Sequence, residues 1–304
     1  MNESFLDSAT LRENVVSLAR NIGYVPRSKT ASRASVSFDV TANSTSTEIR
    51  LQPGLVCVGR SNDSDVVFSI SEEIVASTTV TSGIATASFG SVTAPIDVLE
   101  GTFLTSQFVV DGSLDQRFIL DNANIDTSSI VAYVGSPGIR GKQYKLVDNI
   151  VGISSISDTY LIQEVQDERY ELLFGDGIFG RKPDNGAVIT VQYVVTSGSE
   201  GNGPSHFNFA GSFLGDAGQV ITPSFTPTIN TIAPAANGGD IESIDSIKYF
   251  APRLYSSQYR AVTARDYESI VQQVYPNTES VSVVGGEEVD PPQFGTVLIL
   301  SLIH

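Results

Sequence analysis

The sequence has few of the residues from which catalytic and metal sites are built. Its 304 residues include one cysteine, Cys57, and two histidines, His206 and His304. A single cysteine excludes an internal disulfide framework and zinc sites that need several thiolates. Two histidines leave almost no material for Ser–His–Asp or Cys–His catalytic sites. We therefore expect no enzymatic activity, no metal and no cofactor, and we expect Cys57, in the apolar run LVCV, to be a buried core residue.

Basic residues are also scarce. Lysine and arginine total 18 against 34 acidic residues, which gives a formal net charge of −16. Phosphate binding needs clustered Lys and Arg, so the charge balance disfavours nucleic acid and anionic membrane as partners. No apolar stretch reaches the roughly 18–20 residues that span a bilayer, and residues 1–20 lack a signal-peptide pattern. We expect a soluble protein that is made in a cytoplasm.

Several polar motifs could suggest small-ligand chemistry, and each has a simpler interpretation. Asp176, Asp184 and Asn185 could offer oxygen ligands to calcium, but their spacing does not fit an EF-hand and tight turns favour these residues. The glycine-rich segment at residues 198–204 lacks the Lys-Ser/Thr that follows a phosphate-binding loop. The pairs Asp240/Glu242 and Glu287/Glu288 are expected to lie on solvated faces, because an acidic chain produces such neighbours freely.

The pattern of apolar residues predicts a mainly β protein of the α+β class. Thr10 and Glu13 have the spacing of a capping box, and an apolar stripe from residue 11 to residue 22 predicts a helix that Gly23 ends. Its stripe could pack on the body of the protein or on a neighbour. From Ala34 the period changes to 2, and short alternating runs with frequent turn signals predict consecutive antiparallel β domains.

After a segment rich in glycine and proline, the helical period returns. Residues 244–254 predict a helix that Pro252 should kink or interrupt, and Thr263 with Asp266 predicts the start of a second helix that ends before Pro276. Two strands then complete a small C-terminal α+β unit, which we expect to continue beyond this sequence. We expect an N-terminal helix and linker at 1–33, β domains at 34–100 and 101–196, a return segment at 197–240, and an assembly domain at 241–304. The sequence leaves open whether the first β domain continues after residue 197, around an inserted domain.

Several motifs resemble one protein family in order along nearly the whole chain. They are the segment at residues 2–28, ELLFGDGIFG at 171–180, the glycine-rich segment at 198–203, GGDIES at 238–243 and QYRAVTARDYE at 258–268. Together they resemble the large inner-ring baseplate wedge protein of T-even-like myophages, and the last is also similar to the broader baseplate J-like family of contractile injection systems.

The resemblance implies a structural subunit of a contractile phage tail, located in the tail baseplate of the virion. Such proteins pair with a second copy, associate with smaller wedge proteins, and join neighbouring wedges into a ring around the central hub that rearranges on sheath contraction. As the protein interface we predict Tyr255, Tyr259, Arg260, Tyr267, Ile270 and Val274. The alternative is an adhesin-like or carbohydrate-binding β module, since Ser/Thr-rich strands and a low pI suit receptor-binding domains; a tail-associated hydrolase is a weaker alternative.

Overall fold

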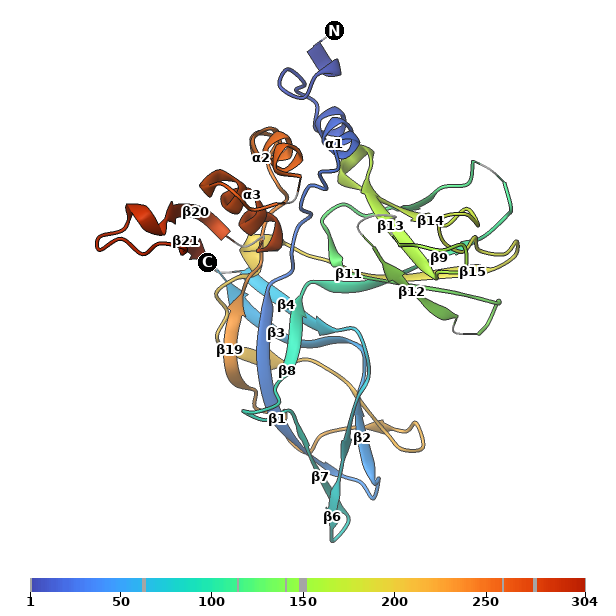
Figure 1. Cartoon of the computed structure of the whole chain (residues 1–304). Coiled ribbons are helices and arrows are strands. Elements are labelled where there is room, and N and C mark those ends of the chain that lie inside the picture. The colour runs from blue at the N-terminus through green and yellow to red at the C-terminus, as the bar shows by residue number, and fades with distance from the viewer. Residues whose placement is uncertain are drawn as a thin grey trace.

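The computed structural model describes residues 2–61, 64–113, 115–139, 141–147, 152–258, 260–275 and 278–303. The protein is α+β and mainly β, as the sequence predicts, with an N-terminal helix and a small C-terminal α+β part. Three parts are visible in Figure 1: a first β unit at the bottom, a second set of strands at the right, and the helices above. Short 3₁₀ turns η1 to η4 lie at Asn2–Ser4, Gln166–Glu168, Gly198–Gly201 and Gly286–Glu288.

The first β unit consists of two sheets built from two separate segments of the chain, residues 33–100 and 207–236. The larger sheet has the order β16-β3-β4-β8-β1-β7-β6, with β19 also paired to β1, and the smaller one has the order β18-β17-β2-β5. Its strands are β1 (Arg33–Asn43), β2 (Glu48–Leu51), β3 (Gly54–Ser61), β4 (Ser64–Ile70), β5 (Ile74–Ser77), β6 (Thr79–Thr81), β7 (Ile84–Phe89), β8 (Ile96–Glu100), β16 (Phe207–Phe209), β17 (Phe213–Gly215), β18 (Val220–Ile221) and β19 (Asn230–Ala236). Residues 207–236 therefore return to the sheets that residues 33–100 begin.

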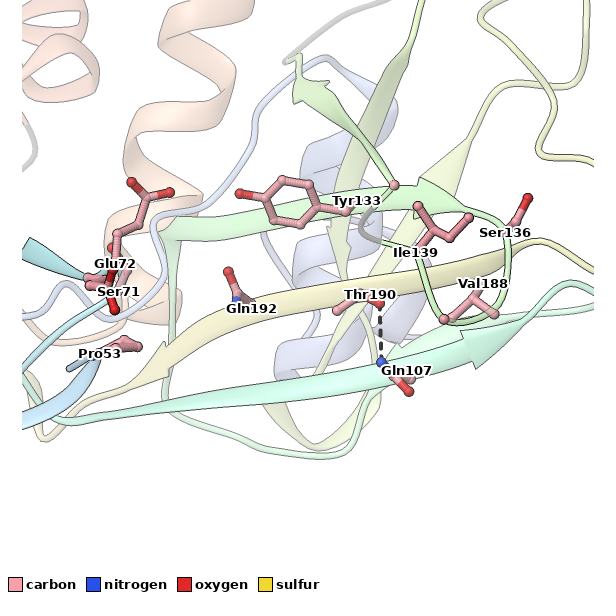
Figure 2. A pocket seen from close by; sticks show the side chains of 13 residues that line it. Pro53, Ser71, Glu72, Gln107, Tyr133, Ser136, Ile139, Val188, Thr190 and Gln192 are labelled. Atoms are coloured by element: carbon pink, nitrogen blue, oxygen red, sulfur yellow. Dashed lines mark hydrogen bonds between the residues drawn. The ribbon is translucent and has the colours of Figure 1, made fainter. Parts of the chain in front are cut away.

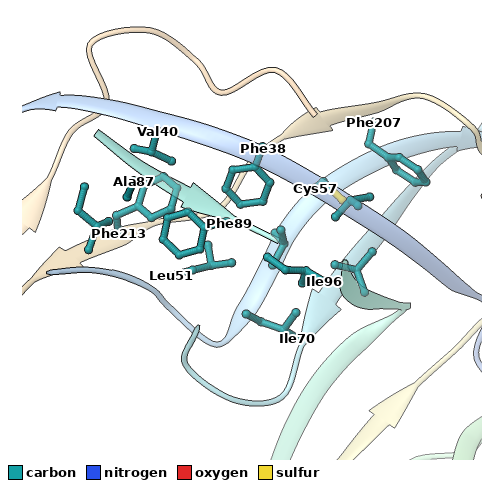
Figure 3. Packing of buried hydrophobic residues seen from close by; sticks show 14 of the residues in the cluster. Phe38, Val40, Leu51, Cys57, Ile70, Ala87, Phe89, Ile96, Phe207 and Phe213 are labelled. Carbon is teal, nitrogen blue, oxygen red and sulfur yellow. The ribbon is translucent and has the colours of Figure 1, made fainter. Parts of the chain in front are cut away.

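A cluster of phenylalanines fills the first β unit. Phe38 on β1 stacks on Phe89 of β7 with ring centroids 5.3 Å apart, and Phe209 stacks on Phe213 at 5.0 Å. Phe38, Phe89 and Phe213 lie together in Figure 3, beside Leu51 of β2 and Cys57 of β3. Because residues of both sheets contribute, the alternating pattern from Ala34 to Val40 becomes one closed apolar core. Cys57 lies in this core and is fully buried, which confirms its predicted role.

Between β8 and the return strands, the chain forms a second β unit, called the insert below. Its single sheet has the order β10-β14-β13-β12-β11-β15-β9. All its pairs are antiparallel except β12 with β13, which run parallel. The strands are β9 (Thr102–Val109), β10 (Phe118–Leu120), β11 (Ile125–Gly135), β12 (Lys142–Leu146), β13 (Thr159–Glu164), β14 (Tyr170–Phe174) and β15 (Val188–Val195). The insert has its own buried apolar cluster, which includes Tyr160, Leu172 and Tyr193.

The two ends of the chain meet in a helical unit. It contains α1 (Arg12–Asn21), α2 (Ile244–Ser257), α3 (Ala264–Val274) and the hairpin of β20 (Thr278–Gly285) with β21 (Val297–Ile303). Val15, Val16 and Ala19 of α1 are buried in one cluster with Ile247, Ala251 and Leu254 of α2. The apolar stripe of the N-terminal helix is therefore covered by the same chain.

The two predicted helix starts differ in outcome. At α3 the prediction is confirmed, because Thr263 and Asp266 form a capping box around the first turn. At α1 it is wrong, because Leu11 is the N-cap and no side chain caps the helix. The reason is Glu3, whose carboxylate accepts from the Thr10 hydroxyl at 2.7 Å and from the Thr10 backbone N–H at 3.0 Å. Thr10 is thereby held outside the helix, and the sequence pattern alone could not reveal this competing acceptor.

Pro252 does not end α2, which continues to Ser257. The expected interruption is therefore wrong, and the burial of Ala251 and Leu254 on either side of the proline offers a reason, since tertiary packing outweighs the cost of one missing backbone donor. In the part of the chain that the structure describes, no helix is long and apolar enough to cross a bilayer.

Candidate assembly surface

The side chains that could act in catalysis or metal binding lie apart from one another. His206 is exposed in the loop before β16, and its Nδ1 lies 3.1 Å from the hydroxyl of neighbouring Ser205. Burial in the first β unit raises the pKa of the Cys57 thiol to about 12, so the side chain stays protonated and unreactive near neutral pH. His304 lies outside the described residues. Within the described ranges, no group of three or more His, Cys, Asp or Glu side chains is placed to hold a metal ion.

The glycine- and acid-rich motifs have structural roles. Asp176 accepts from the backbone N–H groups of Ile178 and Phe179, both at 2.8 Å, which shapes the loop after β14. Both hydrogen bonds lower the pKa of Asp176, and the one from Phe179 contributes most. Gly198 has φ +73°, and a Cβ there would lie 2.8 Å from Asp240 Oδ1. The glycine is thus needed for close packing between the two ends of the return segment, at residues 198 and 239–240.

A polar groove of about 680 Å³ separates the first β unit from the insert. Figure 2 shows Pro53, Ser71 and Glu72 of the first β unit at one end and the strands that carry Gln107 and Thr190 at the other. Gln107 Nε2 donates to the Thr190 hydroxyl at 3.4 Å. Because its two walls belong to different units, the shape of the groove depends on how these units are oriented.

The structure places the six predicted interface residues in different environments. Tyr255 near the end of α2 and Val274 at the end of α3 are 63% and 69% exposed. Arg260 is exposed and donates to Gln258 Oε1 at 2.9 Å. Tyr267 and Ile270 are half-buried, and Ile270 packs against the helical cluster. Tyr259 lies outside the described residues, so Tyr255 and Val274 are the accessible apolar side chains of the set.

Exposed apolar side chains near these helices also gather on the last strand, which the predicted interface omits. Val297, Leu298, Ile299 and Leu300 are each between 42% and 57% exposed, although all belong to one strand. A continuous apolar run of this kind is typical of a strand that is covered on both faces. Here β21 has β20 as its only strand neighbour among the described residues, so its outer edge and much of both faces remain open. The run of four apolar residues at 297–300 was the sequence signal that could have pointed to this surface.

The register of the hairpin shows which face points away from the protein. Ile299 lies opposite Val283, which is buried, whereas Leu298 and Leu300 lie opposite Val284 and Ser282. Directly opposed residues of an antiparallel pair share a face, and successive residues alternate between faces. Leu298 and Leu300 therefore point away from the face that carries Val283. We call this face, with the open edge of β21, the hairpin surface.

Comparison with known proteins shows that α3 and the hairpin are similar to a named family. Residues 263–301 match the family described as baseplate structural protein gp6, C-terminal domain I. Across 89% of the chain, the sequence is 26% identical to baseplate wedge protein gp6 of Enterobacteria phage T4. The chain is related to the baseplate wedge proteins of T-even-like phages. The resemblance seen in the sequence motifs is thus confirmed, and the chain spans 42% of the length of that relative.

One solved structure was also found to be similar. The anti-feeding prophage baseplate, determined by cryo-electron microscopy, aligns with 93% of this chain and 50% of the matched chain, at 13% identity and a TM-score of 0.31. A score this low does not establish a common overall fold.

Proposed function

We propose that the chain is a non-enzymatic structural subunit of a baseplate wedge in the tail of a contractile phage. The observation that supports this most strongly is the sequence match to the T4 wedge protein, which extends over 89% of the chain and therefore includes all three parts of the fold. In this proposal the protein is made in the host cytoplasm and becomes part of the virion. It joins neighbouring wedges into a ring around the central hub, and that ring rearranges when the sheath contracts.

We further propose that the helical unit carries the contact with other baseplate proteins, including a second copy of this chain. The support is the exposed apolar area there, to which Tyr255, Val274 and the hairpin surface contribute. Large exposed apolar patches mark interaction sites more often than isolated exposed side chains do. The open edge of β21 could also accept a strand from a partner through backbone hydrogen bonds.

The subunit role is tested by detecting the chain in purified phage particles and in isolated baseplates. We expect a stoichiometric component of both. Its absence from intact particles would contradict the proposal.

The assembly surface is tested with the double variant Leu298→Ser/Leu300→Ser. These substitutions remove apolar area from the hairpin surface and leave the Val283 face intact, whereas Ile270→Asp would place a charge against the helical cluster. We expect weaker self-association and weaker binding to other wedge proteins, measured by sedimentation velocity over a concentration series. The matched control is Val220→Ser/Phe225→Ser, which removes two side chains that are 75% and 82% exposed on the first β unit. Equal association of both variants and the wild type would contradict the assignment of this surface.

A further inference from the structure

The three parts of the protein have separate apolar cores. The buried clusters of the first β unit, the insert and the helical unit have no member in common. Where the parts meet, carboxylates with little exposure make several of the contacts. These are Glu100 and Asp126, which are 2% and 3% exposed, and Glu164, whose side chain is 6% exposed. A polar junction fixes geometry through a few directional contacts and leaves each core intact if these contacts open.

Arg12 makes the ion pair that connects the insert to the helical unit, in addition to the hydrogen bonds of Ser28 with Thr127 and of the Ala31 backbone N–H with Asp126. On α1, its Nε and Nη2 donate to the two carboxylate oxygens of Glu164 on β13, at 2.7 and 3.0 Å. Its Nη1 donates to the backbone carbonyl of Glu242 at 2.5 Å. A guanidinium supplies this arrangement because its donors form a planar fork that matches a carboxylate.

Glu242 in turn is fixed within the helical unit. Its carboxylate accepts from the Tyr24 hydroxyl at 2.6 Å, from Ser246 Oγ at 2.7 Å and from the Arg27 backbone N–H at 3.1 Å. Arg12 therefore spans from a rigid anchor in the helical unit to the insert.

Apolar packing beside this ion pair is incomplete. A cavity of about 90 Å³ lies between α1 and the strands of the insert, lined by Val16, Leu161, Ile162, Glu164 and Tyr170 among others. Tyr170 is 4% exposed, and its hydroxyl has no hydrogen-bond partner among the described residues. If α1 and the insert separate here, water can reach this hydroxyl and supply the hydrogen bond that it lacks.

The backbone passes between the first β unit and the insert at two points that lie next to each other. The chain enters the insert at Gly101, between β8 and β9, and leaves it at Thr196, after β15. Gly101 has φ +112°, and a Cβ there would lie 2.2 Å from the Val195 carbonyl oxygen, so the two crossings touch. The Thr196 hydroxyl donates to the carboxylate of Glu100 at the same place. Two adjacent crossings form an axis about which the insert can turn.

We propose that the Arg12–Glu164 ion pair is a releasable latch that sets the orientation of the insert, with the paired crossings at Gly101 and Thr196 as its hinge. When the latch opens, the insert turns relative to both other parts, and the polar groove lined by Glu72 and Gln107 changes width. This inference rests on the proposed function, because a ring that rearranges needs subunits with alternative orientations of their parts.

The test measures the distance between spin labels on the insert and the helical unit. Nitroxides are placed at the exposed positions Thr105 and Ser256 in a Cys57→Ala background, and distances are measured by double electron–electron resonance. We expect one narrow distribution with Arg12 present and a broad or shifted one for Arg12→Met. Glu164→Gln, which keeps the shape of the side chain and removes its charge, is expected to broaden the distribution less.

The matched control is the ion pair of Arg117 with Glu171, which lies wholly within the insert. It is also bidentate, at 2.8 and 2.6 Å, and its carboxylate side chain is again 6% exposed. Arg117→Met should leave the distance distribution narrow. An unchanged distribution in folded Arg12→Met protein would overturn the latch, and so would failure of both Arg12→Met and Arg12→Lys to fold, because the pair would then be required for the fold. Either result leaves the baseplate role standing, since that role is tested on particles.

Discussion

The first β unit and the C-terminal hairpin are both rich in apolar strands, but the two regions bury them differently. Phe38, Phe89 and Phe213 are at most 2% exposed, because two sheets close over them. Leu300 on β21 is 57% exposed, because among the described residues this strand pairs with β20 alone and no further sheet packs on it. An isolated two-stranded hairpin is marginally stable in water. The difference shows that the first β unit covers its own apolar strands, whereas the hairpin presents a surface that another element can cover.

The largest effect is expected in the closed core. Phe38→Ala removes a ring that packs on Phe89 and Phe213 and should lower the free energy of unfolding by about 3–5 kcal/mol. Leu300→Ala is the comparison and should change it by less than about 1 kcal/mol, because little apolar area is lost from an exposed site. Urea unfolding followed by circular dichroism measures both. Similar losses at the two positions would show that the hairpin is as well packed as the core.

A smaller effect is expected at the start of α3. Thr263→Ala removes the hydroxyl that accepts from the Asp266 backbone N–H and should destabilise the helix by about 1 kcal/mol. Because the helical unit has its own core, hydrogen exchange should quicken in α3 and β20 and stay unchanged in the first β unit. Uniform acceleration across the chain would show instead that the parts unfold together.

The smallest effect is expected at the N-terminus. Hydrogen bonds from Asn14, and then from Thr10, lower the pKa of Glu3 to about 2 from an ordinary value of 4.5. A carboxylate with a lowered folded-state pKa stabilises the protein above its unfolded-state pKa, and this contribution is lost as the pH falls through the folded-state value. The stability difference between wild type and Glu3→Gln should therefore be constant above pH 4.5 and vanish toward pH 2. Thermal unfolding at several pH values measures it, and a difference that persists at pH 2 would contradict the contact.

The exposure of some residues of the predicted interface could be read from the sequence, and that of others could not. The helical period placed Tyr255 and Val274 near the ends of two helices, where the structure exposes them. The same period could not show that Ile270 contacts the helical cluster. Residues at the border between the apolar and polar faces of an amphipathic helix can be either covered or exposed, and the period does not distinguish the two. The six-residue interface and the domain boundaries stay predictions.

What the sequence determined by itself is local. Alternation gave the strand that begins near Ala34, the Thr263–Asp266 spacing gave the capping box, and the apolar neighbours of Cys57 gave its burial. The tertiary structure decided the long-range contacts: the return of residues 207–236 to the first β unit, the capture of Thr10 by Glu3, and the contact of Arg12 with Glu164. The physical reason is that period and capping depend on neighbours within a few residues, whereas strand pairing and buried ion pairs depend on which distant segments the closed cores bring together.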